Sequence, residues 1–238
     1  MSSTSPMARL KAQSIRDFDI RQVLRQHIAD EHADEPDTLV IDELTLPLQD
    51  VRADLAAVNG MLHGYEIKSD RDTLARLPGQ AEAYNRTFDT MTLVATRRHT
   101  DAARITIPSW WGIIEARGAN GTIELHRRRR SRPNPSVTAT AIVGLLWRGE
   151  VLDALEELNL AAGLRTKSRR ILCCHLAQNI SLNQLKVIVR TKLKSRENWR
   201  VAPSPFRDGD LSRFAAKSLR CQANRDWLLS QKSPRRQH

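Results

Sequence analysis

Short strand-like segments lie between two helical patterns in the first half of the chain. Apolar residues at helical spacing predict helices over residues 17–31 and 72–88, the second interrupted by Pro78. Runs rich in β-branched and apolar residues predict strands over residues 38–44, 51–58, 61–68 and 91–95, and a further hairpin over 105–107 and 111–125 with a turn at Asn120-Gly121. The order αβββαβ restricts this half to a mixed α/β (α+β) fold.

The loop at Asn59-Gly60, a strong hairpin signal, decides which side chains share a face of the sheet. A two-residue loop would pair residue 54 with 65 and place Asp54 on the face opposite Glu66. A three-residue loop over 58–60, with Gly60 in the left-handed conformation of a bulge, would pair 52 with 66 and place Asp54 diagonally beside Glu66. A site that uses both carboxylates therefore predicts the bulged loop.

Asp54, Glu66 and Lys68 form the chemical candidate of this half. Glu66 and Lys68 are two residues apart in a strand, so they project from one face. Carboxylate oxygens are hard ligands for Mg²⁺, and a nearby ammonium group can orient an attacking water and offset developing negative charge. The alternative is a half-exposed strand whose Asp, Glu and Lys make ordinary cross-strand ion pairs.

The element order, with Asp54 and Glu66-Ile67-Lys68 on the second and third strands, resembles the restriction-endonuclease-like core of the PD-(D/E)XK nuclease superfamily, including MmcB-like and RecB-type nuclease domains. The resemblance implies Mg²⁺-dependent (or Mn²⁺-dependent) hydrolysis of phosphodiester bonds in DNA. Asp54 and Glu66 would hold the metal, and Lys68 would assist the water.

The resemblance extends to three further residues. Glu43 is the candidate for the additional acidic ligand that many members carry; the alternative is a carboxylate at the strand edge paired with Arg52. Gln80 and Tyr84 match the QxxxY motif of RecB-type members, and their spacing of four places them on one helix face.

Charge divides the chain into two unequal halves. The whole chain carries +11, but residues 1–125 hold 14 basic against 19 acidic residues, and the remainder holds 24 against 8. The run of arginines and prolines between them predicts a domain over residues 1–126, a linker over 127–137 and a basic helical module over 138–238. The arginine run itself is equally compatible with a solvated linker and with a segment that contacts phosphate. So strong a basic charge favours a polyanionic partner, with DNA first and RNA not excluded.

The basic half has a helical pattern of apolar residues from Thr138 onward, compatible with a helix-turn-helix-like or a helix-extension-helix module. The residues predicted to contact nucleic acid are Arg165, Lys167, Arg169, Arg170, Lys186, Arg190 and Lys194. The last three repeat every four residues and form a stripe along one helix face. A solvated face is the competing explanation, but this half holds too few acidic residues to neutralise the stripe by itself.

Other features narrow the possible classes. No run approaches the roughly 20 apolar residues of a membrane helix, and the first residues lack the apolar core of a signal peptide, so a cytoplasmic protein is expected. Three cysteines favour neither a disulfide framework nor structural zinc. His63, the pair Trp110-Trp111 and the run Cys173-Cys174-His175 are better explained as packed residues than as catalytic ones.

Two other classes of function stay open. One is a non-catalytic nucleic-acid-binding or regulatory protein on a nuclease-like scaffold, and the other is an assembly partner for another protein. A homodimer is compatible with either.

Overall fold

The computed structural model describes residues 14–46, 51–119 and 122–196. Its strands are β1 (Leu39–Leu46), β2 (Val51–Val58), β3 (Leu62–Lys68), β4 (Thr90–Thr96), β5 (Gly112–Ala119) and β6 (Thr122–Arg129). Its helices are α1 (Asp17–Glu31), α2 (Leu77–Thr87), α3 (Arg97–Thr106), α4 (Ala139–Val143), α5 (Arg148–Glu157), α6 (Arg169–Asn179) and α7 (Leu182–Lys194). The mixed α/β class is confirmed, and the first six elements follow the predicted order αβββαβ.

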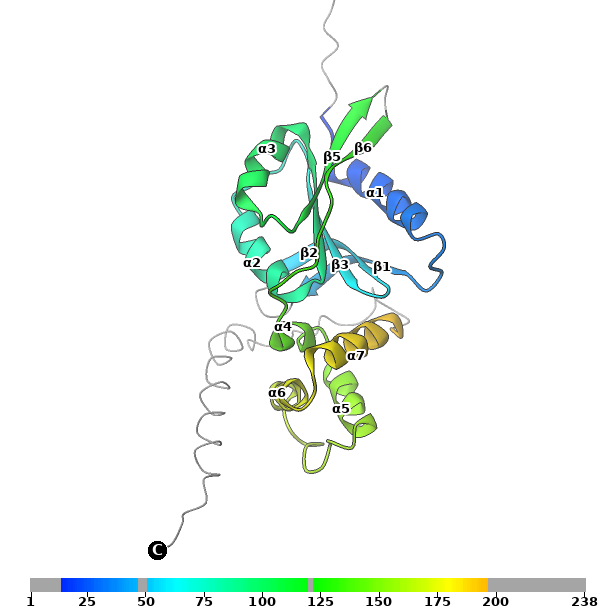
Figure 1. The fold of residues 1–238 in the computed structure, drawn as a ribbon, viewed down its shortest axis with the longest axis vertical. Coiled ribbons are helices and arrows are strands. Elements are labelled where there is room, and N and C mark those ends of the chain that lie inside the picture. Colours follow the sequence, from blue (N-terminus) through cyan, green and yellow to red (C-terminus); the bar gives the residue numbers. More distant parts are fainter. Residues whose placement is uncertain (1–13, 47–50, 120–121, 197–238) are drawn as a thin grey trace, which may run out of the picture.

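The strands form one mixed sheet in sequence order, from β1 at one edge to β6 at the other (Figure 1). Neighbouring strands are antiparallel except for β3, β4 and β5, which are parallel. Parallel neighbours need crossover connections, and α2 and α3 supply them between β3, β4 and β5. The start of β2 and the end of β3 therefore lie beside α2, and the candidate site is located there.

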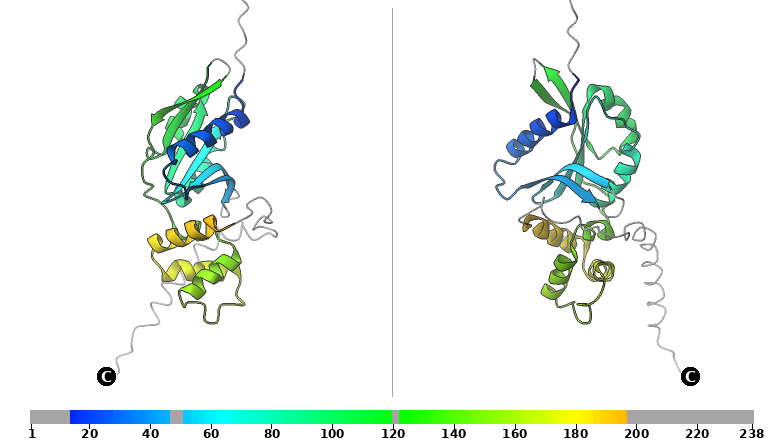
Figure 2. Two further views of the ribbon diagram at one scale, coloured as in Figure 1. Left: turned by 90° about the vertical axis from the view of Figure 1, so that its right-hand side faces the viewer. Right: turned by 180° about the vertical axis from the view of Figure 1, so that it is seen from behind.

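The two faces of the sheet are covered differently (Figures 1 and 2). On one face α1 buries Ile20, Leu24 and Ile28 in a small apolar cluster that includes Ile67 and Val94 of the sheet. The other face belongs to the larger cluster, which includes buried residues of α2 and α3. Removing these side chains from water is the main driving force for packing the layers, at roughly 25 cal/mol per Å² of apolar surface.

The helices α4 to α7 lie beyond one end of the sheet, beneath it in Figure 1. Their buried side chains, among them Leu155, Leu172 and Leu185, belong to the same apolar cluster as the α2 face of the sheet. Arg169 fixes the start of α6 by donating to the carbonyl oxygens of Leu146 and Gly144. The division of the chain into two domains stays a prediction. Within the described ranges, no helix has both the length and the apolar character that crossing a membrane requires.

Three expectations from the sequence need correction. Pro78 does not interrupt a helix but lies in the first turn of α2, where its missing N–H is not needed. The strand expected over 105–107 is the end of α3, and Ile105 is 89% exposed. Residues 127–129, expected in the linker, complete β6 at the edge of the sheet. The turn at Asn120-Gly121 falls outside the described residues.

Candidate functional site

The turn between β2 and β3 places Asp54 and Glu66 at the same end of the hairpin. Val58 pairs with Leu62 and Leu55 with Tyr65, so continuing the ladder by one residue sets Asp54 opposite Glu66. The loop has three residues, as predicted, but it spans 59–61 instead of 58–60, and Gly60 does not adopt a left-handed conformation. The Asn59 side chain closes the loop instead by accepting a hydrogen bond from the Met61 amide at 3.0 Å.

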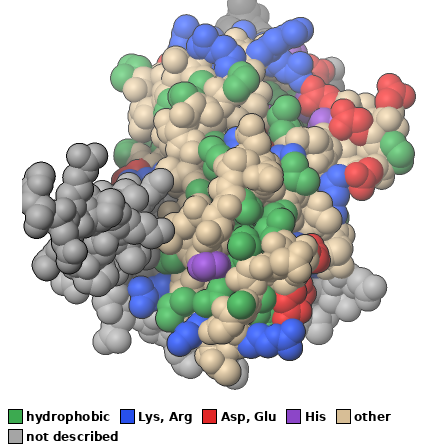
Figure 3. Space-filling view, turned by 60° about the horizontal axis from the view of Figure 1, so that its bottom comes forward, with side chains coloured by type: hydrophobic (Ala, Val, Ile, Leu, Met, Phe, Trp, Pro, Cys, Tyr) green, Lys and Arg blue, Asp and Glu red, His purple; other side chains and the backbone are tan. Residues whose placement is uncertain are grey.

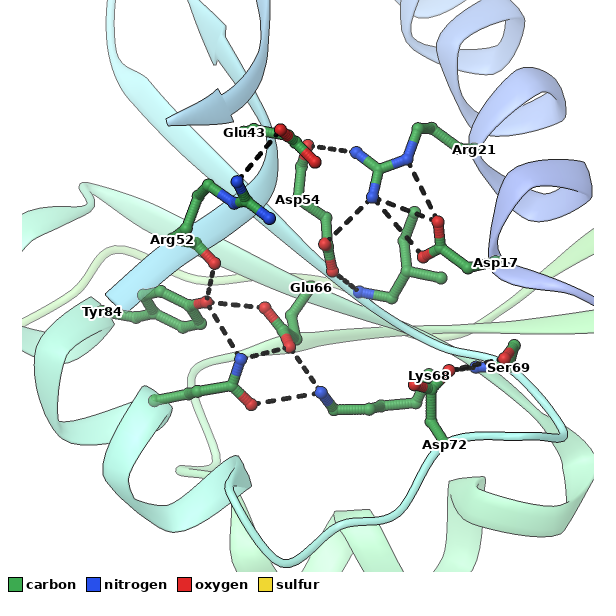
Figure 4. Close-up of polar contacts among 12 residues, drawn as sticks. Asp17, Arg21, Glu43, Arg52, Asp54, Glu66, Lys68, Ser69, Asp72 and Tyr84 are labelled. Atoms are coloured by element: carbon green, nitrogen blue, oxygen red, sulfur yellow. Dashed lines mark hydrogen bonds and ion pairs between the residues drawn. The ribbon is translucent and has the colours of Figure 1, made fainter. Parts of the chain in front are cut away.

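Glu66 is the centre of a buried polar network (Figure 4). Lys68 Nζ and Gln80 Nε2 each donate to Glu66 Oε1 at 2.6 Å, and the Tyr84 hydroxyl donates to Oε2 at 2.6 Å. The side chains of Lys68 and Glu66 are 4% and 2% exposed, so the ion pair between them is shielded from water. The structure thus brings together four of the predicted residues, and both oxygens of Glu66 already have donors from the chain itself.

Asp54 lies beside this network but is held by different groups. Its Oδ2 accepts a hydrogen bond from the Ile67 amide at 2.7 Å, and its Oδ1 lies 3.0 Å from Arg21 Nη2 of α1. Burial and the nearby charge of Glu66 raise the pKa of Asp54 to about 6, although the Ile67 amide and Arg21 oppose the shift. The strand pairing and the contact with Ile67 place the Asp54 carboxylate beside the Glu66 network.

Glu43 stands apart from the buried network. Its carboxylate pairs with Arg52 at 3.1 Å, and the side chains of Arg52 and Glu43 are 59% and 51% exposed. This is the ion pair that sequence reasoning offered as the alternative to a metal ligand. Across residues 14–46, 51–119 and 122–196, no three His, Cys, Asp or Glu side chains gather as a metal site would require. In this arrangement the carboxylate oxygens of Asp54 and Glu66 accept hydrogen bonds from groups of the chain itself. Binding of Mg²⁺ or Mn²⁺ by these two residues stays a prediction.

Tyr84 and Gln80 hold Glu66 from α2. The Tyr84 hydroxyl also lies 2.9 Å from the Arg52 carbonyl oxygen, and Gln80 Oε1 accepts from Lys68 at 3.1 Å. Burial and the charge of Glu66 raise the pKa of Tyr84 far above its ordinary value, so the hydroxyl keeps its proton and donates. These contacts give the predicted QxxxY spacing a clear structural role: it orients the Glu66 carboxylate.

The predicted basic stripe on α7 faces acidic residues of the N-terminal half. Lys186 Nζ lies 2.7 Å from Asp89, Arg190 Nη1 lies 3.7 Å from the same carboxylate, and Lys194 pairs with Asp37. The three basic side chains are 22%, 18% and 20% exposed. The expectation that the stripe lacks acidic partners is therefore wrong, because the partners come from the other half of the chain.

The remaining predicted basic residues lie around the loop before α6. Arg165 is 75% exposed and pairs with Glu156 at 3.0 Å, and Lys167 is exposed. Arg169 is committed to two backbone carbonyls, and Arg170 is partly buried. In the view of Figure 3, Lys and Arg side chains lie in separate groups around the margins, with hydrophobic and uncharged side chains between them. This end of the molecule presents no single basic surface in that view.

The arginine run, interpreted from the sequence as a solvated linker or a phosphate-contacting segment, begins within the sheet, because residues 127–129 belong to β6. Arg128 in β6 donates to Glu115 of β5 at 2.8 Å, and Arg129 donates to the carbonyl oxygen of Trp111 at 2.7 Å. Arg132, just after the strand, is exposed and donates to the Ser109 carbonyl at 2.9 Å. The signal that could have found this strand is the alternation of apolar and polar residues over 122–126, with Ile123 and Leu125 on one face, directly before the arginine run.

The weaker candidates lie in packed positions. His63 lies between the hydroxyls of Thr90 and Thr92, at 2.5 and 2.9 Å, and burial lowers its pKa to about 3. Trp111 is fully buried and donates to Asn85, and Cys173 is buried in the larger cluster. The interpretation of these residues as parts of the core holds for both Trp111 and Cys173.

Comparison with known proteins gives three matches. A family model described as bacteriophage P4 protein cII matches residues 12–201. A curated relative, protein cII of Enterobacteria phage P4, is 29% identical over 160 residues, which cover 67% of this chain and 60% of the relative. A solved structure, the SPO1766 protein of unknown function from Silicibacter pomeroyi, shares 16% identity at a TM-score of 0.37 and covers 64% of this chain and 100% of its own.

These matches correct the resemblance drawn from the sequence. The family model and the curated relative both point to protein cII of phage P4 and not to a PD-(D/E)XK nuclease family. The expected assignment to that superfamily is therefore wrong, and so is the metal-dependent DNA hydrolysis that it implied. Residues that resembled a nuclease motif form an internal polar network in this fold.

Proposed function

Since the chain belongs to the bacteriophage P4 protein cII family, we propose that it is a non-catalytic nucleic-acid-binding protein with a regulatory role. It acts by occupying nucleic acid and leaves phosphodiester bonds intact. The observation that carries this proposal is the concentration of exposed arginines at the β6 edge of the sheet.

The arginines of this edge come from three segments of the chain. Arg128 lies in β6, Arg132 follows the strand, and Arg104 lies near the end of α3. Burial and the charges of Arg104 and Arg132 lower the pKa of Arg129, a further arginine of this edge. Like charges gathered in this way attract the phosphate backbone of nucleic acid and release its counterions on binding.

A charged edge strand also has a simpler explanation. Charges on an edge prevent two sheets from pairing edge to edge, and natural proteins use them for that purpose. That explanation accounts for arginines within β6, but Arg104 and Arg132 lie outside the strand. Nucleic-acid binding accounts for the whole group, and Arg165 and Lys167 offer a second exposed basic group in the helical part.

The buried network supports binding without hydrolysis. Glu66 and Lys68 are almost completely shielded from water, and each Glu66 oxygen accepts from a side chain of the same fold. A buried charge needs such partners, because an unpaired one would destabilise the fold by several kcal/mol, on the order of 3–5. A role in stabilising the packing of β2, β3 and α2 is therefore enough to explain the network.

Binding can be tested with fluorescently labelled duplex DNA, single-stranded DNA and RNA over a series of salt concentrations. We expect the affinity to fall steeply as salt rises, because phosphate contacts release counterions. Incubation of the same substrates with Mg²⁺ or Mn²⁺ should leave them uncut. Cleavage would refute the non-catalytic assignment, and a lack of binding to every nucleic acid at low salt would refute the proposal itself.

The edge is tested with a charge-matched pair of double variants. Arg104→Gln with Arg132→Gln, which leaves the Arg128–Glu115 ion pair intact, should weaken binding and reduce the slope of log affinity against log salt by about 2, one for each lost phosphate contact. Arg71→Gln with Arg97→Gln removes the same charge from exposed positions elsewhere and should change the slope far less. Equal effects of the two double variants would show that the β6 edge is not the binding surface.

A further inference from the structure

The loop between α5 and α6 presents a run of exposed hydrogen-bond donors. Residues 158–168 join the two helices, and the last four of them are all exposed: Arg165, Thr166, Lys167 and Ser168. Side chains of these four types are among those that contact the phosphate oxygens of DNA. Figure 1 shows the loop at the lower end of the helical part, on the side that points away from the sheet. The loop therefore has the composition of a phosphate-binding surface.

The backbone of this loop is held in place by the fold itself. The Arg148 guanidinium group donates to the carbonyl oxygens of Arg165 and Lys167, at 2.5 and 3.2 Å. The Lys167 amide donates to the Leu164 carbonyl oxygen at 2.9 Å, and Leu164 packs against the larger apolar cluster. A surface that is ordered before binding loses less conformational entropy when a ligand arrives. The exposed donors of the loop are thus already positioned for a partner.

Positive charge is in excess around the loop. Three of the four acidic residues of α5 already pair with basic side chains: Glu150 with Arg196, Glu156 with Arg165 and Glu157 with Lys192. The fourth is Asp153. Arg148, Lys167 and Arg170 lie in the loop or beside it, and none of them forms an ion pair with the described residues. The unpaired cations attract a polyanion to this end of the molecule.

The helical body separates this loop from the β6 edge. On its side toward the sheet, Lys186 of α7 pairs with Asp89 at 2.7 Å. On the same side, the Thr138 amide at the start of α4 donates to the Arg86 carbonyl oxygen at 2.9 Å. The α5–α6 loop lies on the opposite side of the helical part (Figures 1 and 2). In the view of Figure 3, no continuous basic track crosses this end of the described chain.

We propose that the α5–α6 loop is a second phosphate-binding surface and that one chain bridges two segments of duplex DNA, one at the loop and one at the β6 edge. The inference rests on the proposed function, because the β6 edge supplies one of the two contacts. Duplex DNA is stiff, with a persistence length of about 150 base pairs. Two straight segments therefore reach the two surfaces at a lower cost than one segment bent around the helical body.

Bridging is tested by the capture of one duplex through another. A short biotinylated duplex is immobilised on beads, and a fluorescent duplex of the same sequence is added with or without the full chain. The full chain should retain the fluorescent duplex on the beads. Retention should fall again when protein is in large excess over DNA, because each duplex then binds its own protein molecules. Raising the salt concentration should release the captured duplex.

A charge-matched pair of double variants tests the loop. Lys167→Gln with Arg170→Gln breaks no ion pair among the described residues. It should reduce capture by about tenfold or more, from the loss of two charge-assisted contacts. It should weaken binding to a single duplex by less than about threefold, since the β6 edge is unchanged. Arg71→Gln with Arg97→Gln removes the same charge from exposed positions outside the loop and should leave capture close to that of the wild type.

The outcomes separate the bridge from the proposed function. Loss of capture in the loop variant, with binding to a single duplex retained, supports the bridge. A wild type that binds one duplex but captures no second one overturns the bridge and leaves the proposed function intact. Equal capture by the loop variant and the wild type also overturns the bridge, and so does an equal loss in both double variants. If no nucleic acid binds at low salt, the proposed function itself fails.

Discussion

Lys186 of α7 forms an ion pair with Asp89, with 2.7 Å between Nζ and Oδ1. The same carboxylate accepts a hydrogen bond from the Leu62 amide at 2.8 Å and lies 3.7 Å from Arg190. Asp89 is thus a point at which the start of β3, the end of α2 and the last described helix meet. The basic stripe of α7 stabilises a contact within the chain, where Asp89 and Asp37 offset most of its positive charge.

Asp89→Asn should lower the free energy of unfolding by about 1–3 kcal/mol, because two cations would lose the charge that holds them together. Urea denaturation monitored by circular dichroism measures the change. The matched control is Glu82→Gln, which breaks an exposed pair with Arg86 whose side chains are 63% and 50% exposed; it should cost less than about 0.5 kcal/mol. Equal losses would mean that α7 does not depend on Asp89.

Asp54 should make the stability of the protein depend on pH. Its folded-state pKa of about 6 lies above the ordinary value of 3.8, so the folded state binds the proton more tightly than the unfolded chain does. The resulting stability is present below about pH 4 and is lost as pH rises through about 6. Relative to Asp54→Asn, the wild type should therefore lose up to about 3 kcal/mol between pH 4 and 7. The difference in free energy of unfolding between the wild type and Asp54→Asn is measured at both pH values. An equal difference at pH 4 and pH 7 would contradict this prediction.

Tyr84→Phe should destabilise the fold by about 1–3 kcal/mol, because Glu66 Oε2 would lose its 2.6 Å donor inside the protein. Tyr65→Phe is the control: Tyr65 is also buried, but its hydroxyl has no hydrogen-bond partner among the described residues. Thermal unfolding of both variants measures the difference. If both phenylalanine variants melt alike, the hydrogen bond to Glu66 contributes nothing to stability.

Gly64→Ala should lower the free energy of unfolding by about 1–3 kcal/mol through overpacking. A Cβ atom at Gly64 would lie 2.5 Å from the sulfur of Met91 and 2.9 Å from the Phe88 ring. At Gly60, four residues earlier in the chain, nothing lies within 4 Å of the added carbon. Gly60→Ala should therefore change the same quantity, measured in urea, by less than about 1 kcal/mol, and a larger loss at Gly60 would be inconsistent with this packing.

The sequence predicted the elements whose periodicity is strong. The helix over 17–31 and the αβββαβ order are found. The helix α3 was missed because it buries only His99, Thr100 and Ala103, which give no apolar period. Ile105 and Ile107 suggested a strand, yet Ile105 points to solvent.

Local sequence patterns predicted which residues of the candidate site lie together, but not the function of the site. The spacing of Glu66 and Lys68, and that of Gln80 and Tyr84, correctly indicated shared faces that meet around one carboxylate. The same spacing is compatible with an internal polar network and with a metal site, so it could not distinguish a nuclease from a protein with a different function. The partners of α7, Asp89 and Asp37, lie about a hundred residues or more away in sequence, beyond the reach of local pattern.

The strand pairing on either side of the three-residue loop at 59–61 fixes which face of the sheet each side chain of β3 occupies. A shift of one residue in the pairing of β3, as opposed to a length change that the loop itself takes up, would turn β3 over, sending Glu66 and Lys68 into the apolar layer under α1 and Ile67 toward α2. Two residues added together would leave every side chain of the strand on its own side. An odd change in the length of this hairpin tip is therefore compatible with the Glu66 network only where the loop itself absorbs it.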